Sequence, residues 1–305
     1  MLNKVKQNIS KVIVDKENEI ELMIIALLSD GHILLNDVPG TGKTTMAKCF
    51  SKSLDGTFKR LQFTPDTLPS DIIGQEYFDV KTSEFKVRKG PVFSHVLLID
   101  EINRAVPRSQ SALLEIMEEK TVTLGGLSYP LPDPFIVIAT QNPFDSIGTF
   151  PLPEAQLDRF LLTIRQGYPS YENEKKMLKR FRIENPSDLV ESVISINEII
   201  GFKEEVKRVL ISDEIEDYLM KIIQSTRNHK YVEVGVSPRG SLSFMRAIQS
   251  RAFIHGRGFC IPDDVKSLAQ PVLAHRITLN MEGEIKTTKQ HIVSEILDST
   301  PVEVE

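Results

Sequence analysis

A glycine-rich loop between an apolar strand and a helix constrains the fold of this chain most strongly. Residues His32 to Asn36 form a short continuous run of mainly apolar side chains, and a helical pattern follows from Met46 to Leu54. Between them lies the segment Gly40-Thr41-Gly42-Lys43-Thr44. A strand, loop and helix in this order can surround a phosphate with backbone N–H groups, because glycines let the backbone approach closely.

Two side chains of this loop suit a magnesium nucleoside triphosphate. Lys43 would reach the β- and γ-phosphates, and the Thr44 hydroxyl would help to hold Mg²⁺. The competing interpretation is a plain glycine turn. It is disfavoured because a lysine in a first helical turn opposes the helix dipole by about 0.3 to 1 kcal/mol unless an anion is near. The predicted binding segment is Val38, Pro39, Gly40, Thr41, Gly42, Lys43, Thr44 and Thr45.

The loop departs from the usual phosphate-binding motif at one position. Asp37 stands where the motif opens with glycine, whereas the glycines nearest the phosphates, Gly40 and Gly42, are intact. We expect Asp37 to change the bend of the loop without abolishing binding.

Polar residues follow two further predicted strands. Asp100 and Glu101 end the strand Val96 to Ile99, and Asn142 follows the strand that begins at Phe135. Ligands of open α/β sheets bind at the carboxyl ends of strands. Asp100 would anchor Mg²⁺ through its water, and Glu101 would polarise the attacking water. Adjacent acids are often only solvated loop residues, and Asn-Pro is a common turn, so the upstream phosphate loop is what favours the functional interpretation.

The alternation of strands and helices predicts a three-layer α/β domain over residues 1–168. Helical patterns cover Glu17 to Ser29 and Ser109 to Glu119, and Thr57 to Phe63 is a further candidate strand. Unalternating apolar strands are typical of parallel sheets covered by helices on both faces.

The helical periodicity of residues 169–305 predicts a second, mostly helical domain. Helical patterns cover Glu214 to Ser225 and Ser237 to Ile254, and Lys289 to Leu297 is a further candidate helix. Ser237 is a plausible cap with Pro238 at the first helical position, so Arg239 places a cation in the unfavourable first turn. This placement hints at a nearby anion.

Composition limits the class of protein. The 305 residues are 41% hydrophobic and 26% charged, which is typical of a globular protein. The apolar runs are too short to span a bilayer and no signal core follows the N-terminus, so we expect a cytoplasmic protein without a membrane span. The net charge of −5 argues mildly against coating of nucleic acid. Cys49 and Cys260 suggest neither a disulfide framework nor a zinc site.

The chain resembles the MoxR branch of the AAA+ ATPases in four motifs. They are DVPGTGKTT, LLIDEINRAVPRSQSALLEIMEEKTVTLGG, ATQNPFDSIGTFPLPEAQLDRFLL and GVSPRGSLSFMRAIQSRA, and they occur in the family's order across most of residues 31–274. The resemblance implies a P-loop core with a five-stranded parallel sheet, a C-terminal helical lid, and nucleotide bound between them.

The resemblance also implies a role for individual residues. The assigned residues are Lys43 and Thr44 (phosphate loop), Asp100 and Glu101 (second nucleotide motif), Asn142 (first sensor), Arg159 (arginine finger) and Arg239 (second sensor). Arg159 would reach a neighbouring protomer. Arg104 and Arg108 lie on the same family stretch and are alternatives for that contact.

The function implied by the resemblance is hydrolysis of ATP with Mg²⁺ in a ring, expected to be a hexamer. Hydrolysis would remodel or activate a client, often with a partner that carries a von Willebrand factor A domain. Insertions at residues 64–91 and 120–134 contain hairpin-like pieces, which in similar proteins face the ring pore.

Two alternatives remain open at the level of sequence. A nucleotide-gated binding module would change shape with little turnover. A nucleic-acid motor would use the basic cluster Lys86, Arg88 and Lys89 in the first insertion, although three charges are usually only a solvated hairpin. Nucleic acid is therefore the less favoured partner.

Overall fold

The computed structural model describes residues 2–36, 42–142, 148–165, 167–168, 170–182 and 189–302. Its main sheet contains β1 (Ile33–Asn36), β2 (Phe58–Gln62), β5 (Val96–Asp100), β8 (Ile136–Gln141) and β9 (Leu162–Ile164). The five strands lie in the order β2, β5, β8, β1, β9, and the pairs β2 with β5, β5 with β8 and β8 with β1 are parallel. The predicted five-stranded parallel core is confirmed.

Burial explains the two kinds of strand sequence in this sheet. The strands β1, β5 and β8 are buried along nearly their whole length, which requires unbroken apolar runs. The edge strand β2 is half exposed and carries Lys59, Arg60 and Gln62 among its residues. Polar side chains of β2 are thereby available at the edge of the sheet.

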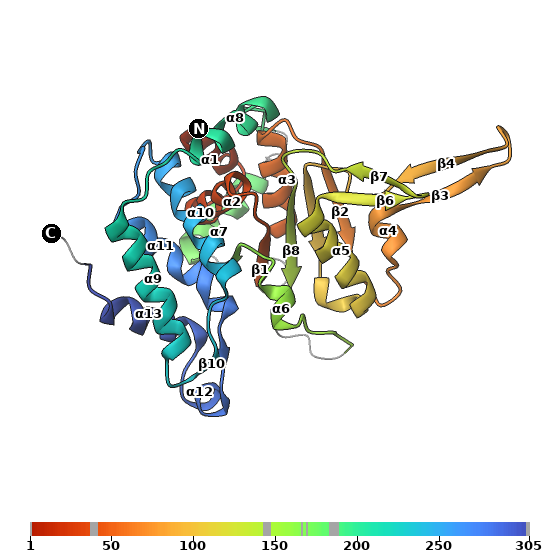
Figure 1. The fold of residues 1–305 in the computed structure, drawn as a ribbon. Helices are drawn as coiled ribbons and strands as arrows, with labels where there is room; N and C mark the ends of the chain where they lie inside the picture. Colours follow the sequence, from red (N-terminus) through yellow and green to blue (C-terminus); the bar gives the residue numbers. More distant parts are fainter. Residues whose placement is uncertain are drawn as a thin grey trace. The chain divides into compact units, whose positions relative to one another are not determined.

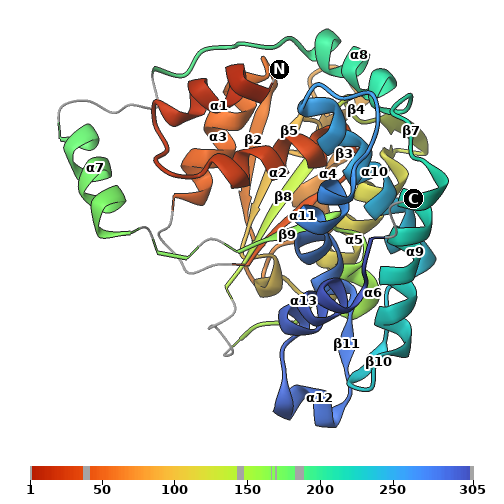
Figure 2. The same cartoon turned by 90° about the vertical axis from the view of Figure 1, so that its left-hand side faces the viewer.

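Helices cover both faces of the sheet. Helix α3 (Lys43–Ser53) lies on one face and α5 (Pro107–Glu119) on the other (Figures 1 and 2). This arrangement follows from right-handed crossovers that run in opposite directions along the sheet. Helix α1 (Leu2–Ser10), which the sequence pattern did not predict, packs on α3, and Asn8 Nδ2 donates to Ser53 Oγ at 2.9 Å.

The two predicted insertions form antiparallel hairpins. After the short helix α4 (Pro69–Ile73), β3 (Gly74–Asp79) pairs with β4 (Glu84–Lys89), and this hairpin extends away from the sheet (Figure 1). The second hairpin pairs β6 (Thr121–Leu124) with β7 (Leu127–Pro130).

A glycine is required at the start of the first hairpin, where β3 begins. Gly74 has φ 95°, and a Cβ atom there would lie 2.1 Å from the Arg88 carbonyl oxygen. A side chain at this position would force the two strands apart.

The C-terminal region is mostly helical, as predicted. Its helices are α6 (Glu154–Leu157), α7 (Tyr171–Phe181), α8 (Ile196–Val206), α9 (Asp213–Asn228), α10 (Pro238–Ile254), α11 (Pro262–Leu273), α12 (Met281–Lys286) and α13 (Lys289–Ser299). A small antiparallel pair, β10 (Val232–Val234) with β11 (Thr278–Leu279), was not predicted. Among the described residues, no helix combines the length and apolarity needed to cross a bilayer.

The chain forms two compact units. The first contains residues 1–23, 32–152 and 164–200, and the second contains residues 24–31, 153–163 and 201–305. The predicted division has a single boundary after residue 168, whereas each unit consists of three separate segments of the chain. Each segment belongs to the unit in which it makes most of its contacts. The domains 1–168 and 169–305 therefore remain a prediction.

A buried arginine joins distant segments within the second unit. The Arg276 side chain is only 1% exposed, and its Nε lies 2.8 Å from Asp158 Oδ1. Its terminal nitrogens donate to the carbonyl oxygens of Leu161 at 2.9 Å and Phe160 at 2.7 Å. Burial lowers the pKa of Arg276 to about 10, although Asp158 opposes the shift. Asp158 also accepts a hydrogen bond from Ser237 Oγ at 2.9 Å.

We predict that His275 makes the second unit sensitive to acid. Burial lowers the pKa of His275 well below its ordinary value, and the positive charge of Arg276 lowers it further. The unfolded chain then takes up a proton below about pH 6.5 that the folded chain does not bind. The free energy of unfolding therefore falls with decreasing pH, by up to about 1.4 kcal/mol per pH unit.

Urea unfolding between pH 7.5 and pH 5 measures this effect. His275→Gln should flatten the pH dependence, whereas His291→Gln, which changes an exposed histidine of α13, should leave it unchanged. Equal slopes for the wild type and His275→Gln would contradict the prediction.

Candidate functional site

The start of α3 has features that favour the binding of an anion. Gly42 caps the helix with φ 82° and ψ 16°, a left-handed conformation that favours glycine, and as a glycine it has no side chain to cap the first turn. That turn contains no acidic residue, while Lys43 is its first residue. The positive end of the helix dipole and a cationic side chain therefore lie together. The predicted contacts Val38, Pro39, Gly40 and Thr41, and Asp37, lie outside the described residues.

The acid pair lies at the carboxyl end of β5, as predicted. Asp100 is buried, with 8% of its surface exposed, and Glu101 has φ 58° and ψ 54°. A left-handed conformation is strained for a residue other than glycine and tends to occur at functional sites. The neighbouring strand β8 supports it, because Glu101 N donates to Thr140 Oγ1 at 2.9 Å.

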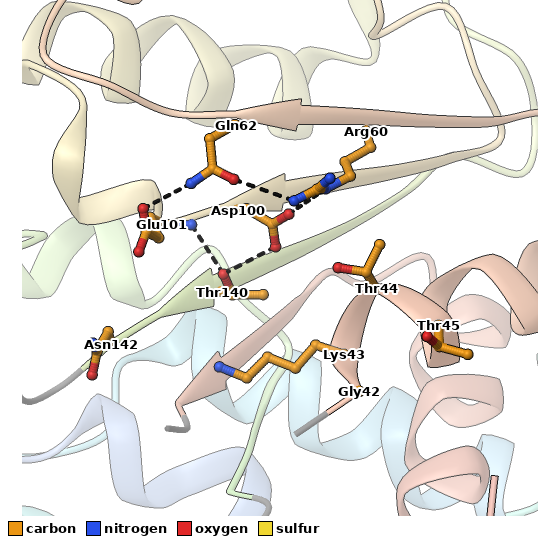
Figure 3. Close-up of a pocket in the computed structure, with 10 residues that line it drawn as sticks. All are labelled: Gly42, Lys43, Thr44, Thr45, Arg60, Gln62, Asp100, Glu101, Thr140 and Asn142. Carbon is orange, nitrogen blue, oxygen red and sulfur yellow. Dashed lines mark hydrogen bonds and ion pairs between the residues drawn. The ribbon is translucent and has the colours of Figure 1, made fainter. Parts of the chain in front are cut away.

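Side chains of the edge strand β2 contact both carboxylates (Figure 3). Arg60 Nε lies 2.5 Å from Asp100 Oδ2, and Gln62 Nε2 donates to Glu101 Oε2 at 2.7 Å. Arg104 Nε lies 3.1 Å from the same Glu101 oxygen. Both acids therefore have nearby donors that partly compensate their negative charge.

The helix start and the acid pair line one pocket of about 390 Å³. Its lining residues are Gly42, Lys43, Thr44, Thr45, Arg60, Gln62, Asp100, Glu101, Thr140 and Asn142. Figure 3 shows the Lys43 side chain extending from the helix start into the space beneath the acid pair. The volume lies within the range of small-molecule sites, roughly 300 to 1,000 Å³.

Arg60, Gln62 and Thr140 were not identified from the sequence. The parallel pairing of β2 with β5 sets Gln62 opposite Asp100, and this long-range pairing cannot be read from local patterns. The alternation of Arg60 and Gln62 along β2 was the one available signal, since residues two apart share a face.

The predicted finger Arg159 and the predicted sensor Arg239 belong to the second unit and are not among the described residues that line the pocket. Arg159 follows α6 and is partly buried, and Arg239 is exposed in the first turn of α10. The predicted cap of that helix is confirmed, because Ser237 Oγ accepts from Gly240 N at 3.0 Å. Asp158, beside Arg159, is held by Arg276 and Ser237.

The donor set of the pocket fits magnesium. The Thr44 hydroxyl and the Asp100 carboxylate supply oxygen atoms, which are the ligands that Mg²⁺ prefers. Within the described ranges, no cluster of three or more histidine, cysteine, aspartate or glutamate side chains could hold a metal ion by itself. The Thr44 and Asp100 oxygens would leave the other coordination positions of a Mg²⁺ ion to water and phosphate oxygens.

Comparisons with known proteins agree with this geometry. Residues 32–162 match the model of the ATPase family associated with various cellular activities (AAA), and residues 224–296 match the AAA lid domain. The crystal structure of a candidate ATPase from Cytophaga hutchinsonii superposes with a TM-score of 0.93 at 38% identity, covering 99% of this chain and 94% of that chain.

Similar sequences indicate which family of AAA ATPases the chain resembles most. The chain is 46% identical over 306 residues to the protein YeaC of Bacillus subtilis, covering 100% of this chain and 96% of YeaC. It is 40% identical over 284 residues to Chaperone MoxR1 of Mycobacterium tuberculosis, covering 90% of this chain and 75% of that protein. Protein MoxR of Methylorubrum extorquens is 30% identical, with coverage of 92% and 88%.

The sheet, the lysine-bearing helix start and the family matches define an ATPase of the AAA+ class with a helical lid. Within that class, the chain belongs to the MoxR family. It therefore binds nucleotide and hydrolyses ATP.

We predict that Lys43→Ala weakens binding of a non-hydrolysable ATP analogue by about 10- to 100-fold. The reason is that hydrogen bonds to charged groups contribute about 1.5 to 3 kcal/mol, and each 1.4 kcal/mol is tenfold. Isothermal titration calorimetry measures the change. Lys59→Ala, which removes an exposed lysine of β2, is the matched control and should bind as the wild type does. Unchanged affinity of Lys43→Ala would refute the assignment of this helix start.

Proposed function

We propose that the chain hydrolyses Mg²⁺-bound ATP within a ring, expected to be a hexamer, and uses the energy to remodel a partner protein. One observation carries the catalytic part of this proposal: the start of α3 and the acid pair of β5 line the same pocket. A triphosphate and its metal need positive donors on one side and carboxylate oxygens on the other. The pocket offers both.

The proposed roles follow from the positions of the side chains. Lys43 neutralises the β- and γ-phosphates, while Thr44 and Asp100 hold the magnesium ion that supplies further charge neutralisation. Glu101 orients and polarises the attacking water, and Asn142, which lines the pocket beyond β8, contacts that water or the γ-phosphate. Gly42 and Thr45, which also line the pocket, are the remaining predicted phosphate contacts among the described residues.

The support of Glu101 is consistent with its proposed role as a base. Its backbone is fixed by Thr140, and its carboxylate contacts Gln62 and Arg104. These contacts hold the Glu101 carboxylate at the edge of the pocket. A carboxylate held in this position could accept a hydrogen bond from the attacking water.

We predict that Glu101→Gln lowers the steady-state release of phosphate by about 10²- to 10⁴-fold, the usual contribution of a general base. Nucleotide binding should persist, because Lys43 and Asp100 are retained. Glu115→Gln, which changes an exposed glutamate of α5, is the matched control. Equal phosphate release by the wild type and Glu101→Gln would favour a nucleotide-gated module with little turnover.

Ring assembly rests on the resemblance and on the placement of two arginines. Arg159 is proposed to enter the pocket of a neighbouring protomer and to stabilise the transition state, while Arg239 in the lid senses the nucleotide. Arg104 fits the finger role less well, because it pairs with Glu101 of its own chain. Arg108, exposed in the first turn of α5, is the remaining alternative.

We predict that mixing Arg159→Ala with Lys43→Ala protein restores ATPase activity. Each variant lacks one half of the proposed active interface, and random assembly makes about a quarter of the ring interfaces complete at an equal ratio. Phosphate release across a series of mixing ratios measures this rescue. Replacing the Lys43→Ala partner with the Arg159→Ala/Lys43→Ala double variant should abolish it. A lack of rescue at every ratio would contradict action in trans.

The β3–β4 hairpin supports a protein as the partner. Phe78, Val80 and Phe85 are 50%, 81% and 70% exposed, and the two phenylalanine rings lie edge to face at 5.2 Å. Exposed apolar side chains grouped in this way are typical of protein contact sites. We propose that this hairpin contacts the client, and that a protein with a von Willebrand factor A domain acts alongside the ring. The name of the relative Chaperone MoxR1 agrees with remodelling.

The basic cluster of the same hairpin gives little support to a nucleic-acid motor. Lys86 Nζ lies 2.5 Å from Asp79 Oδ2. Lys89 Nζ lies over the rings of Phe93 and Tyr129, at 4.8 and 5.5 Å from their centroids. Two of the three cations are thereby engaged within the protein. A phosphate backbone would have to compete with these contacts.

A further inference from the structure

Arg60 is a pocket residue to which the proposed catalytic mechanism gives no role. It lies on the edge strand β2, and its Nε is 2.5 Å from Asp100 Oδ2. The Arg60 side chain is 50% exposed, whereas that of Asp100 is 12% exposed. A half-exposed cation thus contacts a largely buried carboxylate (Figure 3).

The same carboxylate is the one that the proposed function assigns to magnesium. A guanidinium and a Mg²⁺ ion that approach the same carboxylate repel each other, so each weakens the hold of the other on Asp100. Thr140 Oγ1, at 3.5 Å, approaches the other oxygen, Asp100 Oδ1. The ion pair and the metal therefore compete for Asp100.

We propose that Arg60 is a displaceable counter-ion of Asp100, which holds the carboxylate in the nucleotide-free protein and leaves it when the magnesium nucleotide binds. This inference rests on the proposed metal role of Asp100. When no nucleotide is bound, Arg60 partly neutralises the Asp100 carboxylate and lowers its affinity for the metal alone. Asp100 would consequently hold Mg²⁺ mainly when the triphosphate is also bound and can supply further oxygen ligands.

The surroundings of Arg60 lower the free energy needed to move its guanidinium away from Asp100. Its side chain is half exposed, so the released guanidinium regains water. Gln62 Oε1 accepts from Arg60 Nη2 at 3.3 Å, which offers the guanidinium a second partner on its own strand. Partly exposed ion pairs are weak, so a shift of about two- to fivefold in the metal requirement is expected, where fivefold corresponds to about 1 kcal/mol.

The test measures how much Mg²⁺ is needed for half-maximal binding of a fluorescent, non-hydrolysable ATP analogue. Arg60→Gln should lower this concentration about two- to fivefold, and Arg60→Lys should lower it less, since lysine keeps the charge but not the planar fork. Lys59→Gln removes the same charge from the neighbouring position of β2 and should change nothing. A second measurement, binding of Mn²⁺ to the nucleotide-free protein by electron paramagnetic resonance, should show tighter binding in Arg60→Gln.

Two outcomes would overturn the inference. An unchanged Mg²⁺ requirement in Arg60→Gln would show that Arg60 does not compete with the metal. Weaker binding of the analogue by Arg60→Gln, with or without Mg²⁺, would make Arg60 a phosphate ligand instead. Asp100→Asn separates these results from failure of the proposed function: if it leaves the Mg²⁺ requirement unchanged, the metal assignment itself is wrong. Thermal unfolding of each variant verifies the fold.

Discussion

The negative charge at the end of β5 governs the arrangement of this site. Two adjacent carboxylates at the edge of a buried sheet repel each other and lose hydration, so the fold must supply donors around them. The edge strand β2 supplies Arg60 and Gln62, and the first turn after the acids supplies Arg104. The start of α3 provides the opposite charge across the pocket. A magnesium triphosphate, which carries both signs of charge, is the ligand that we propose for the space between these groups.

A second buried charge organises the helical unit. Arg276 is surrounded by backbone carbonyl groups and by Asp158, and Asp158 in turn accepts from the cap of α10. The segment that carries Arg159 is therefore fixed to the start of the helix that carries Arg239. If Arg159 acts as the finger and Arg239 as the sensor, the same hydrogen-bonded network holds the backbone segments that carry these two residues. Removing one partner of a buried ion pair usually lowers stability by more than the intact pair contributes. The reason is that the other charge is then left buried without a partner.

Local sequence patterns predicted much of the core fold. Continuous apolar strands predicted β1, β5 and β8, and helical periodicity predicted α2 (Glu17–Leu28). Both hairpins were predicted from the family resemblance, as insertions. Helix α1 was missed, although its residues Val5 and Ile9 form a buried face. Its sequence was too short and too polar to stand out from a frayed terminus.

The candidate site was predicted only where its residues are local. The loop with Lys43 and the pair Asp100 and Glu101 could be found because each lies next to a recognisable strand. The contacts of Arg60 and Gln62 depend on the order of strands, and the pair of Asp158 with Arg276 joins residues 118 positions apart. Neither can be derived from local periodicity. The roles of Asn142, Arg159 and Arg239 stay predictions, since geometry alone does not test them.

The most direct test of the central claim is a crystal structure with a non-hydrolysable ATP analogue and Mn²⁺, analysed by anomalous diffraction. The proposed mechanism predicts a manganese peak beside the Thr44 hydroxyl, joined to Asp100 directly or through one water, with Lys43 Nζ on the β- and γ-phosphates. A metal and triphosphate bound elsewhere, or a Lys43 side chain directed away from the phosphates, would contradict it.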